Sequence, residues 1–342
     1  MKTIWDKVKE DLKKKAIPIS VVLELTRRCN ISCCHCYNFK DNAELSFAQV
    51  KDIARQLRQA GTLFLSLTGG EIFTKQDIFD ICFYLRQSGF DLSLFTNGTL
   101  INQSNIKTIQ KLNLSEVGIS IQGASAKTHD KITGCQGAFA KSINAISLLK
   151  NEQIPVNLKC TLMKDNFAEY KDVIKLANEL KVPYIIDPIV SPKDDGSKDV
   201  LIYRLSEEQL GAFYQDALLK QKAVFQNQVA DDFTCPAGTV MASISAKGDV
   251  YPCIQLPEKL GNVFEADFKD IWANSKFLTK LRKKINIEQC NNCKLSCFCT
   301  RCPGLAYLED GDAFGISSIA CLNAAVYETI KQKQFLISEG YE

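Results

Sequence analysis

Three cysteines near the start of the chain form a motif that could hold an iron–sulfur cluster. Cys29, Cys33 and Cys36 follow an apolar segment with the spacing C-x3-C-x2-C. One short loop can direct three thiolates at three corners of a 4Fe–4S cubane, which leaves one iron with an open coordination position for a substrate. The alternative is a zinc knuckle with Cys34 or His35 as the fourth ligand, although nothing nearby supplies a second ligand pair at zinc-finger spacing.

Alternating apolar and amphipathic segments must position this loop. The expected strands are Ser20–Leu25, Leu63–Thr68, Leu92–Thr96, Val117–Ile121, Val156–Leu162 and Tyr184–Val190. Helices are expected after the first five, at Phe47–Ala60, Gln76–Gln87, Asn102–Leu112, Ala138–Lys150 and Phe167–Leu180. Apolar strands separated by helices indicate a parallel sheet. We therefore predict an α/β fold, a partial (β/α)6 TIM-like barrel with its chemistry at the carboxyl ends of the strands.

The remaining chain divides into shorter regions. The predicted boundaries are an amphipathic helical extension at 1–16, the barrel at 17–190, a turn-rich linker and helix at 191–233, a cysteine-rich domain at 234–325 and a helix or tail at 326–342. The linker helix is expected over Leu205–Gln226, and short strands are expected around Val240–Ser245 and Val250–Pro252.

Composition excludes several classes of protein. The 342 residues carry a net charge of only +3, which gives no reason to expect nucleic acid as a partner. Met1–Pro18 has no apolar signal region, and the longest apolar runs are far too short to span a bilayer, so we expect a cytoplasmic protein without membrane contact. The chain has fifteen cysteines and two histidines. Clustered cysteines in a reducing compartment more often hold metal than form disulfides.

Three further motifs stand at expected strand ends. Gly69-Gly70-Glu71 ends the second strand, Thr96-Asn97-Gly98 the third and Ser120-Ile121-Gln122-Gly123 the fourth. With the cysteine loop, they make residues 17–190 resemble the radical S-adenosylmethionine (SAM) superfamily, in which a C-x3-C-x-aromatic-C loop follows the first strand. His35 takes the aromatic position here.

The resemblance implies a SAM-binding 4Fe–4S cluster on Cys29, Cys33 and Cys36. It implies that SAM chelates the free iron and is cleaved by one electron to methionine and a 5′-deoxyadenosyl radical. Cys34 is expected to be a spectator thiol. The other implied SAM contacts are His35, Gly69, Gly70, Glu71 as an anion for the methionine ammonium, Asn97, Ser120 at the ribose and Leu162 at the adenine. Asn97 could equally form an Asx turn, and Leu162 could equally be a core residue.

A second group of cysteines lies in the last third of the chain. Its eight members are Cys235, Cys253, Cys290, Cys293, Cys297, Cys299, Cys302 and Cys321. Their spacing resembles the SPASM domain, which implies two auxiliary 4Fe–4S clusters. One would use Cys290, Cys293, Cys299 and Cys321, and the other Cys235, Cys253 and Cys302. The central run is one residue shorter than usual, so Cys297 could complete the second set, or its fourth iron could stay open. A pair of structural zinc sites is the alternative.

SPASM-bearing radical SAM enzymes mostly modify peptides or proteins. The resemblance therefore implies a peptide maturase that abstracts a hydrogen from a ribosomal precursor peptide and installs a thioether or carbon–carbon crosslink. Flavodoxin or ferredoxin would supply electrons, and a separate protein could bind the leader peptide. The alternatives are a sulfatase-type formylglycine maturase with Asp187 as a catalytic carboxylate, a haem-pathway enzyme and, in another class, a non-catalytic electron carrier.

Three cysteines and one loop lie outside these motifs. Cys82, Cys135 and Cys160 are expected to be buried small side chains, with Cys135 at the barrel mouth the only candidate for a functional thiol. His129-Asp130 precedes the same loop and is expected either to cap it or to contact substrate.

Overall fold

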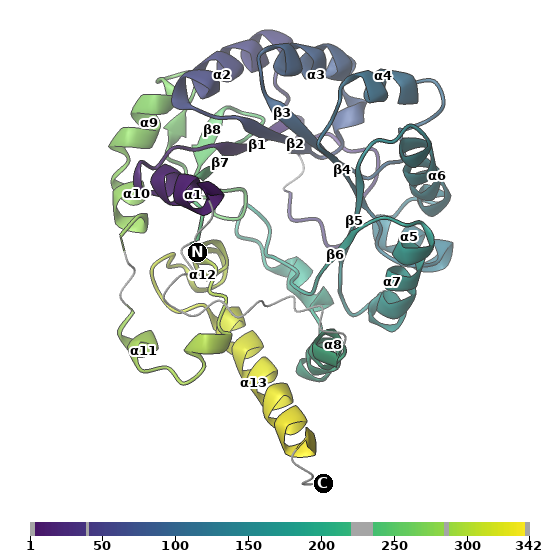
Figure 1. Ribbon diagram of the computed structural model, residues 1–342, viewed down its shortest axis with the longest axis vertical. Helices are drawn as coiled ribbons and strands as arrows, with labels where there is room; N and C mark the ends of the chain where they lie inside the picture. The colour runs from purple at the N-terminus through teal and green to yellow at the C-terminus, as the bar shows by residue number, and fades with distance from the viewer. Residues whose placement is uncertain (1–3, 39–40, 220–234, 284–286, 339–342) are drawn as a thin grey trace.

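Six parallel strands follow one another across the sheet in chain order (Figure 1). The computed structural model describes residues 4–38, 41–219, 235–283 and 287–338. The strands are β1 (Ser20–Thr26), β2 (Phe64–Gly69), β3 (Asp91–Thr96), β4 (Glu116–Ser120), β5 (Val156–Thr161) and β6 (Tyr184–Asp187). The predicted α/β class with a parallel sheet is therefore confirmed, and the sheet curves and stays open.

Helices cover the outer face of this sheet (Figure 1). They are α2 (Phe47–Ala60), α3 (Ile78–Gln87), α4 (Ile106–Lys111), α5 (Ala126–Thr133), α6 (Ala138–Asn151) and α7 (Tyr170–Glu179), preceded by α1 (Ile4–Lys14). Leu23 and Leu25 of β1 are fully buried in the same core as Ile53 and Leu57 of α2. Strand side chains alternate between faces, so Glu24 points to the opposite, inner face.

Two α-helices begin later in the chain than the sequence predicts. The helix expected at Asn102–Leu112 begins only at Ile106, because the Asn102 side chain accepts from the backbone N–H and the hydroxyl of Ser104. The helix expected at Phe167–Leu180 starts as the 3-10 turn η2 (Phe167–Glu169) before α7.

One predicted strand ends earlier than expected, and one helix was not predicted. β6 ends at Asp187 rather than Val190, because Pro188 has no N–H to donate to a neighbouring strand. Helix α5 was not predicted. It begins at Ala126, and the hydroxyl of its N-cap residue Ser125 accepts from the Thr128 N–H.

The C-terminal region joins the same sheet. β7 (Met241–Ile244) pairs in parallel with β1, and β8 (Asp249–Tyr251) and β9 (Gly261–Asn262) follow in antiparallel order. The other elements are η1 (Ile72–Thr74), η3 (Asp199–Tyr203), α8 (Glu207–Leu219), α9 (Phe268–Asn274), α10 (Lys276–Leu281), α11 (Glu288–Asn291), η4 (Ser296–Phe298), α12 (Pro303–Asp310) and α13 (Ser318–Ser338). The predicted helix over Leu205–Gln226 is present as α8, and residues 220–226 lie outside the described part of the chain.

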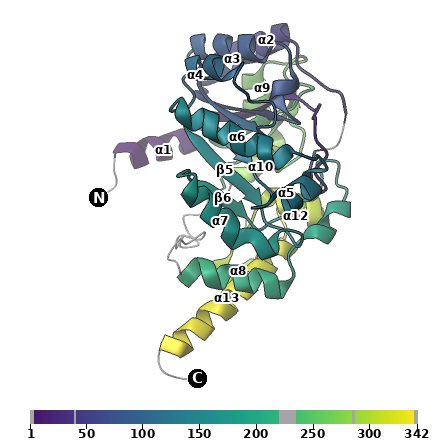
Figure 2. The ribbon, with the colours of Figure 1, turned by 90° about the vertical axis from the view of Figure 1, so that its right-hand side faces the viewer.

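Helix α13 packs beside α8 (Figure 2). The ring of Tyr327 on α13 lies 5.7 Å from that of Tyr214 on α8 and 5.7 Å from that of Phe298. Aromatic packing thus connects the cysteine-rich region to the helices around the sheet. Among the described residues, no helix combines the length and apolar character that a membrane crossing requires.

An ion pair makes the same connection and provides a stability test. Arg204, after η3, donates two hydrogen bonds to the Glu309 carboxylate of α12, at 2.6 and 2.8 Å, and both side chains are largely buried.

Glu309→Gln leaves a buried guanidinium without its counter-charge and should lower the free energy of unfolding by about 3 kcal/mol. Glu179→Gln, which removes the exposed pair with Lys175, should change it by less than about 0.5 kcal/mol. Urea denaturation of both variants checks this, and equal effects would contradict it.

Candidate active site

The structure places the three motif cysteines together just beyond β1. Burial and the nearby thiols of Cys36 and Cys29 raise the pKa of Cys33 to about 12. Metal ligands must be deprotonated, and a bound metal centre offsets the repulsion between neighbouring thiolates.

Gly69 and Gly70 fix the start of this cysteine loop. A Cβ on Gly69 would lie 2.1 Å from the Thr26 carbonyl oxygen, and one on Gly70 would lie 2.3 Å from that of Arg28. The Gly70 N–H donates to Thr26 and the Glu71 N–H to Arg28, both at 2.8 Å. Only glycine permits this approach, so the residues that precede Cys29 are held directly against the end of β2.

Glu71 supports the end of β3. Its carboxylate accepts from the Thr96 hydroxyl at 2.7 Å, the Asn97 N–H at 2.8 Å and the Phe73 N–H at 3.1 Å, and the side chain has no exposed surface. Burial raises its pKa, and the three donors oppose that rise. The Glu71 carboxylate is therefore bonded to the Thr96 hydroxyl and to two backbone N–H groups, and its contact with the methionine ammonium stays a prediction.

Asn97 joins β3 to the cysteine loop. Its side-chain oxygen accepts from the Thr99 N–H at 2.9 Å, which is the Asx turn left open by the sequence. Its amide donates to Asn30 at 2.9 Å, and Asn30 donates to the Thr99 hydroxyl at 2.8 Å. Asn30 lies between Cys29 and Cys33, so this network holds the loop from a second side.

Helix α5 holds the loop from a third side. The N–H groups of Ser32 and Cys34 donate to the carbonyls of Thr133 and Ile132, both at 2.9 Å. Cys34 packs on a small apolar cluster with Tyr203, and its spectator role stays a prediction.

The His129-Asp130 pair has structural contacts. His129 Nδ1 accepts from the Gln122 N–H at 3.0 Å, and Asp130 accepts from the Gly137 and Phe139 N–H groups. The capping alternative therefore holds for Asp130. Cys82 and Cys160 are buried as predicted, and Cys135 is only partly buried.

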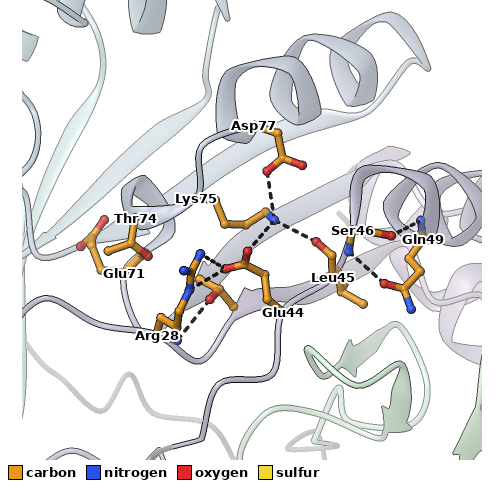
Figure 3. Close-up of polar contacts among 10 residues, drawn as sticks. Arg28, Glu44, Leu45, Ser46, Gln49, Glu71, Thr74, Lys75 and Asp77 are labelled. Carbon is orange, nitrogen blue, oxygen red and sulfur yellow. Dashed lines mark hydrogen bonds and ion pairs between the residues drawn. The ribbon is translucent and has the colours of Figure 1, made fainter.

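A charged network supports the residue before Cys29 (Figure 3). Arg28 donates to Glu44 at 2.6 Å, and the buried ammonium of Lys75 lies 3.5 Å from Glu44 and 3.0 Å from Asp77. Lys75 also donates to the Leu45 carbonyl at 2.8 Å. This network links the cysteine loop to the turn that follows Gly70, and sequence analysis missed it because its charges are far apart in the chain.

The remaining predicted contacts differ in accessibility. Burial lowers the pKa of His35 to about 4, and its Nδ1 is buried without a hydrogen-bond partner among the described residues. Ser120 is half-buried, and no described residue engages its hydroxyl. Leu162 has no exposed surface, so the core alternative holds and the predicted adenine contact is not supported. Asp187 accepts from the Ile189 N–H at 3.0 Å at the end of β6, and surrounding protein raises its pKa.

The thiols of the later cysteines act on one another in two sets, and the ligand division that the resemblance implies stays a prediction. Burial and the thiols of Cys235 and Cys302 raise the pKa of Cys253 to about 12. Burial, with the thiols of Cys290 and Cys293, raises the pKa of Cys321. The pKa of Cys299 is likewise raised by burial and by the thiols of Cys321, Cys290 and Cys293. Cys297 is exposed on η4.

A cavity of about 220 Å³ lies between the first cysteine loop and the loop after Cys253. It is lined by the acids Glu24, Asp41, Asp194, Asp195 and Asp249, by the bases Arg27 and Lys247, and by Tyr37, Tyr251, Ile254 and Pro257, among others. Arg27 lies 2.7 Å from Asp194 and 3.6 Å from Glu24. Lys247 lies 2.7 Å from Asp41, and Lys259, outside the lining, lies 2.6 Å from Asp249. The acids still outnumber these cations, so the cavity is anionic. The residues that line the cavity come from separate segments of the chain, so sequence analysis could not group them. The adjacent basic residues Arg27 and Arg28, before Cys29, are the local feature that points to charged contacts there.

An iron–sulfur cluster fits the first cysteine loop. Its donors are all sulfur, the backbone is fixed on three sides, and an unpaired imidazole nitrogen lies within the loop. Among the described residues, no three cysteine, histidine or acidic side chains are close enough to share a single metal ion. The conclusion that a 4Fe–4S cluster fits this loop therefore depends on its three thiol ligands.

Comparison with known proteins finds a family match in each of two parts of the chain. Residues 23–177 match the radical SAM superfamily, and residues 235–294 match the SPASM iron–sulfur cluster-binding domain. The protein is therefore a radical SAM enzyme with a SPASM domain. It uses SAM and iron–sulfur chemistry, and the alternative of a non-catalytic electron carrier is wrong.

Named relatives fall into two functional groups. The chain is 28% identical to the AdoMet-dependent heme synthase of Methanosarcina barkeri, over 86% of this chain and 94% of that protein. It is 27% identical to the subtilosin biosynthesis protein AlbA of Bacillus subtilis, over 84% of this chain and 67% of that protein. The fold is similar to that of Streptococcus suis SuiB, solved with its precursor peptide, with a TM-score of 0.71, 18% identity, and coverage of 92% of this chain and 79% of that one.

Replacement of Gly70 tests the close backbone approach. Gly70→Ala would force the cysteine loop away from β2, and we expect 5′-deoxyadenosine formation from SAM to fall about a hundredfold, because small displacements of reacting groups have effects of that size. Gly211→Ala is the control, since its Cβ would meet only ordinary contacts at 3.6 and 3.7 Å. Chromatography of reaction mixtures measures the product, and equal rates in the two variants would contradict the argument.

Serine substitutions separate ligand from spectator thiols in the first loop. Cys33→Ser should lose the absorbance and the electron paramagnetic resonance (EPR) signal of the SAM-binding cluster, because it removes one of three ligands. Cys34→Ser should retain both, since Cys34 packs beside Tyr203. Iron and sulfide analysis of both variants provides the measurement, and loss of the cluster in Cys34→Ser would refute this assignment.

Proposed function

We propose that the protein is a peptide maturase that removes a hydrogen atom from a ribosomal precursor peptide and installs a thioether or carbon–carbon crosslink. Sequence similarity to AlbA, a bacteriocin biosynthesis protein, supports this class of substrate. When bound at Cys29, Cys33 and Cys36, the cluster with SAM supplies the 5′-deoxyadenosyl radical that abstracts the hydrogen. The chain's own residues hold that loop and bind the peptide.

The anionic cavity is the observation that carries the choice of substrate. Its lining includes Tyr37, which follows Cys36, and Ile254, which follows Cys253, so a substrate bound there would lie near both cysteine regions. Its lining contains five carboxylates against two cationic side chains. Haem-pathway tetrapyrroles carry several carboxylates and would be repelled there, whereas a peptide with a cationic or neutral side chain would not.

The auxiliary clusters complete the chemistry in this proposal. Cys290, Cys293, Cys299 and Cys321 would hold one 4Fe–4S cluster, and Cys235, Cys253 and Cys302 a second with an iron open to a substrate thiolate. Thioether formation would remove one hydrogen atom from the peptide carbon, a proton from the thiol and one further electron, and a cluster held by these cysteines would supply the acceptor for that electron. A flavodoxin or ferredoxin would supply the electron for SAM cleavage.

A peptide assay tests the proposal. Reconstituted enzyme, SAM and dithionite should convert a Cys-containing peptide encoded beside the enzyme's gene to a product lighter by about two hydrogens. SAM cleavage with an unchanged peptide mass would count against it. Replacement of the cysteine sulfur by a carbonyl oxygen would instead indicate a formylglycine maturase. Zinc in place of iron and sulfide would indicate structural sites.

The haem pathway is the second candidate, because the heme synthase relative is covered over 94% of its length. A tetrapyrrole incubated under the same conditions distinguishes the two. Decarboxylation of the tetrapyrrole together with an unmodified peptide would favour the haem pathway.

Asp187 is the proposed base for the substrate proton. Asp187 is exposed at the end of β6, where solvent and substrate can reach it, and nearby protein raises the pKa of its carboxyl, which makes the ionised form a stronger base. The carboxyl is protonated and inactive below that raised pKa, so peptide modification should increase as pH rises through it. Asp187→Asn should reduce modification about a hundredfold, abolish this pH dependence and leave SAM cleavage intact. An unchanged pH profile measured by mass spectrometry would exclude the role.

A further inference from the structure

Arg301 lies between the two later groups of cysteines. It follows Cys299 of one group by two residues and directly precedes Cys302 of the other. Burial lowers the pKa of Arg301 while the thiols of Cys290, Cys302 and Cys299 oppose that fall, and Arg301 opposes the rise that burial causes in the pKa of Cys235. One cation therefore lies within electrostatic range of both groups.

The Arg301 side chain is anchored in this place by backbone carbonyls. Its Nε donates to the Gly315 carbonyl at 2.8 Å and its Nη2 to the Ala313 carbonyl at 2.6 Å. Both acceptors are neutral, so the anchor positions the guanidinium without cancelling its charge. The Asp312 carboxylate is the acid that acts on Arg301, and it also accepts from the Phe314 N–H at 2.8 Å.

We propose that Arg301 is a shared cation that sets the reduction potentials of both auxiliary clusters. This inference rests on the proposed function, because it requires the two clusters. Reduction adds negative charge to a cluster, so a fixed cation nearby favours the reduced form and raises the potential. Placed between the two sites, Arg301 makes each cluster a better acceptor for the electron left after crosslinking.

EPR-monitored redox titration of Arg301→Gln tests this without using activity. At a fixed potential, the ratio of reduced to oxidised auxiliary cluster should fall about tenfold, a shift of about 59 mV toward lower potential for a one-electron couple. Arg301→Lys retains the charge and should titrate close to the wild type. Unchanged potentials in a fully iron-loaded Arg301→Gln variant would overturn the proposal.

Arg282 provides the matched control. Its guanidinium is also partly buried and anchored by two carbonyls, of Gly238 at 2.7 Å and Trp272 at 3.1 Å, and burial lowers the pKa of both arginines. Cysteines act on Arg301, and burial alone accounts for the shift at Arg282. Arg282→Gln should leave both potentials unchanged, and an equal fall in both variants would show a general structural effect and overturn the inference.

Two further outcomes remain distinguishable. If Arg301→Gln does not retain its iron, Asp312→Asn replaces it as the test. The side chain that this substitution introduces can still accept from the Phe314 N–H, but it no longer carries the negative charge that opposes Arg301. The reduction potentials of both auxiliary clusters should therefore rise, and unchanged potentials would overturn the inference. If the wild-type protein contains only the SAM-binding cluster, the proposed function fails before Arg301 is tested.

Discussion

The close contact between the ends of β1 and β2 is the constraint on which the site depends. The carbonyl oxygens of Thr26 and Arg28 occupy the space that side chains at Gly69 and Gly70 would need. Two backbone hydrogen bonds then fix the peptide units directly before Cys29. A loop that starts from a rigid position can direct its thiols at a metal centre, whereas a loop that starts from a mobile one loses entropy when it binds.

Other elements hold the loop further along its length, and they divide structural from chemical roles. Glu71, Asn97 and His129 are engaged by the protein's own hydrogen bonds, so they position backbone. Burial raises the pKa of the Cys33 thiol, and the buried Nδ1 of His35 has no hydrogen-bond partner among the described residues. This division is typical of a site in which a rigid outer layer orients a reactive inner one.

The sequence predicted what depends on local pattern and missed what depends on contacts over long distances. Apolar strands and helical periodicity indicated the parallel sheet, and the cysteine motifs indicated the radical SAM and SPASM domains. The contacts of Glu71 and Leu162 could not be predicted, because their partners come from other strands. Helix α4 began late because the Asn102 side chain competes with the helix for backbone donors. The Arg28–Glu44–Lys75–Asp77 network likewise required the fold before it could be recognised.

The central claim is that one iron of the first cluster lacks a protein ligand and binds SAM directly. Electron–nuclear double resonance on the reduced enzyme with SAM labelled by ¹⁵N at the methionine amino group tests it most directly. We predict a hyperfine coupling between the cluster spin and that nitrogen, which disappears when SAM is omitted. A reduced cluster whose spectrum is unchanged by SAM, with every iron coordinated by protein, would contradict the account.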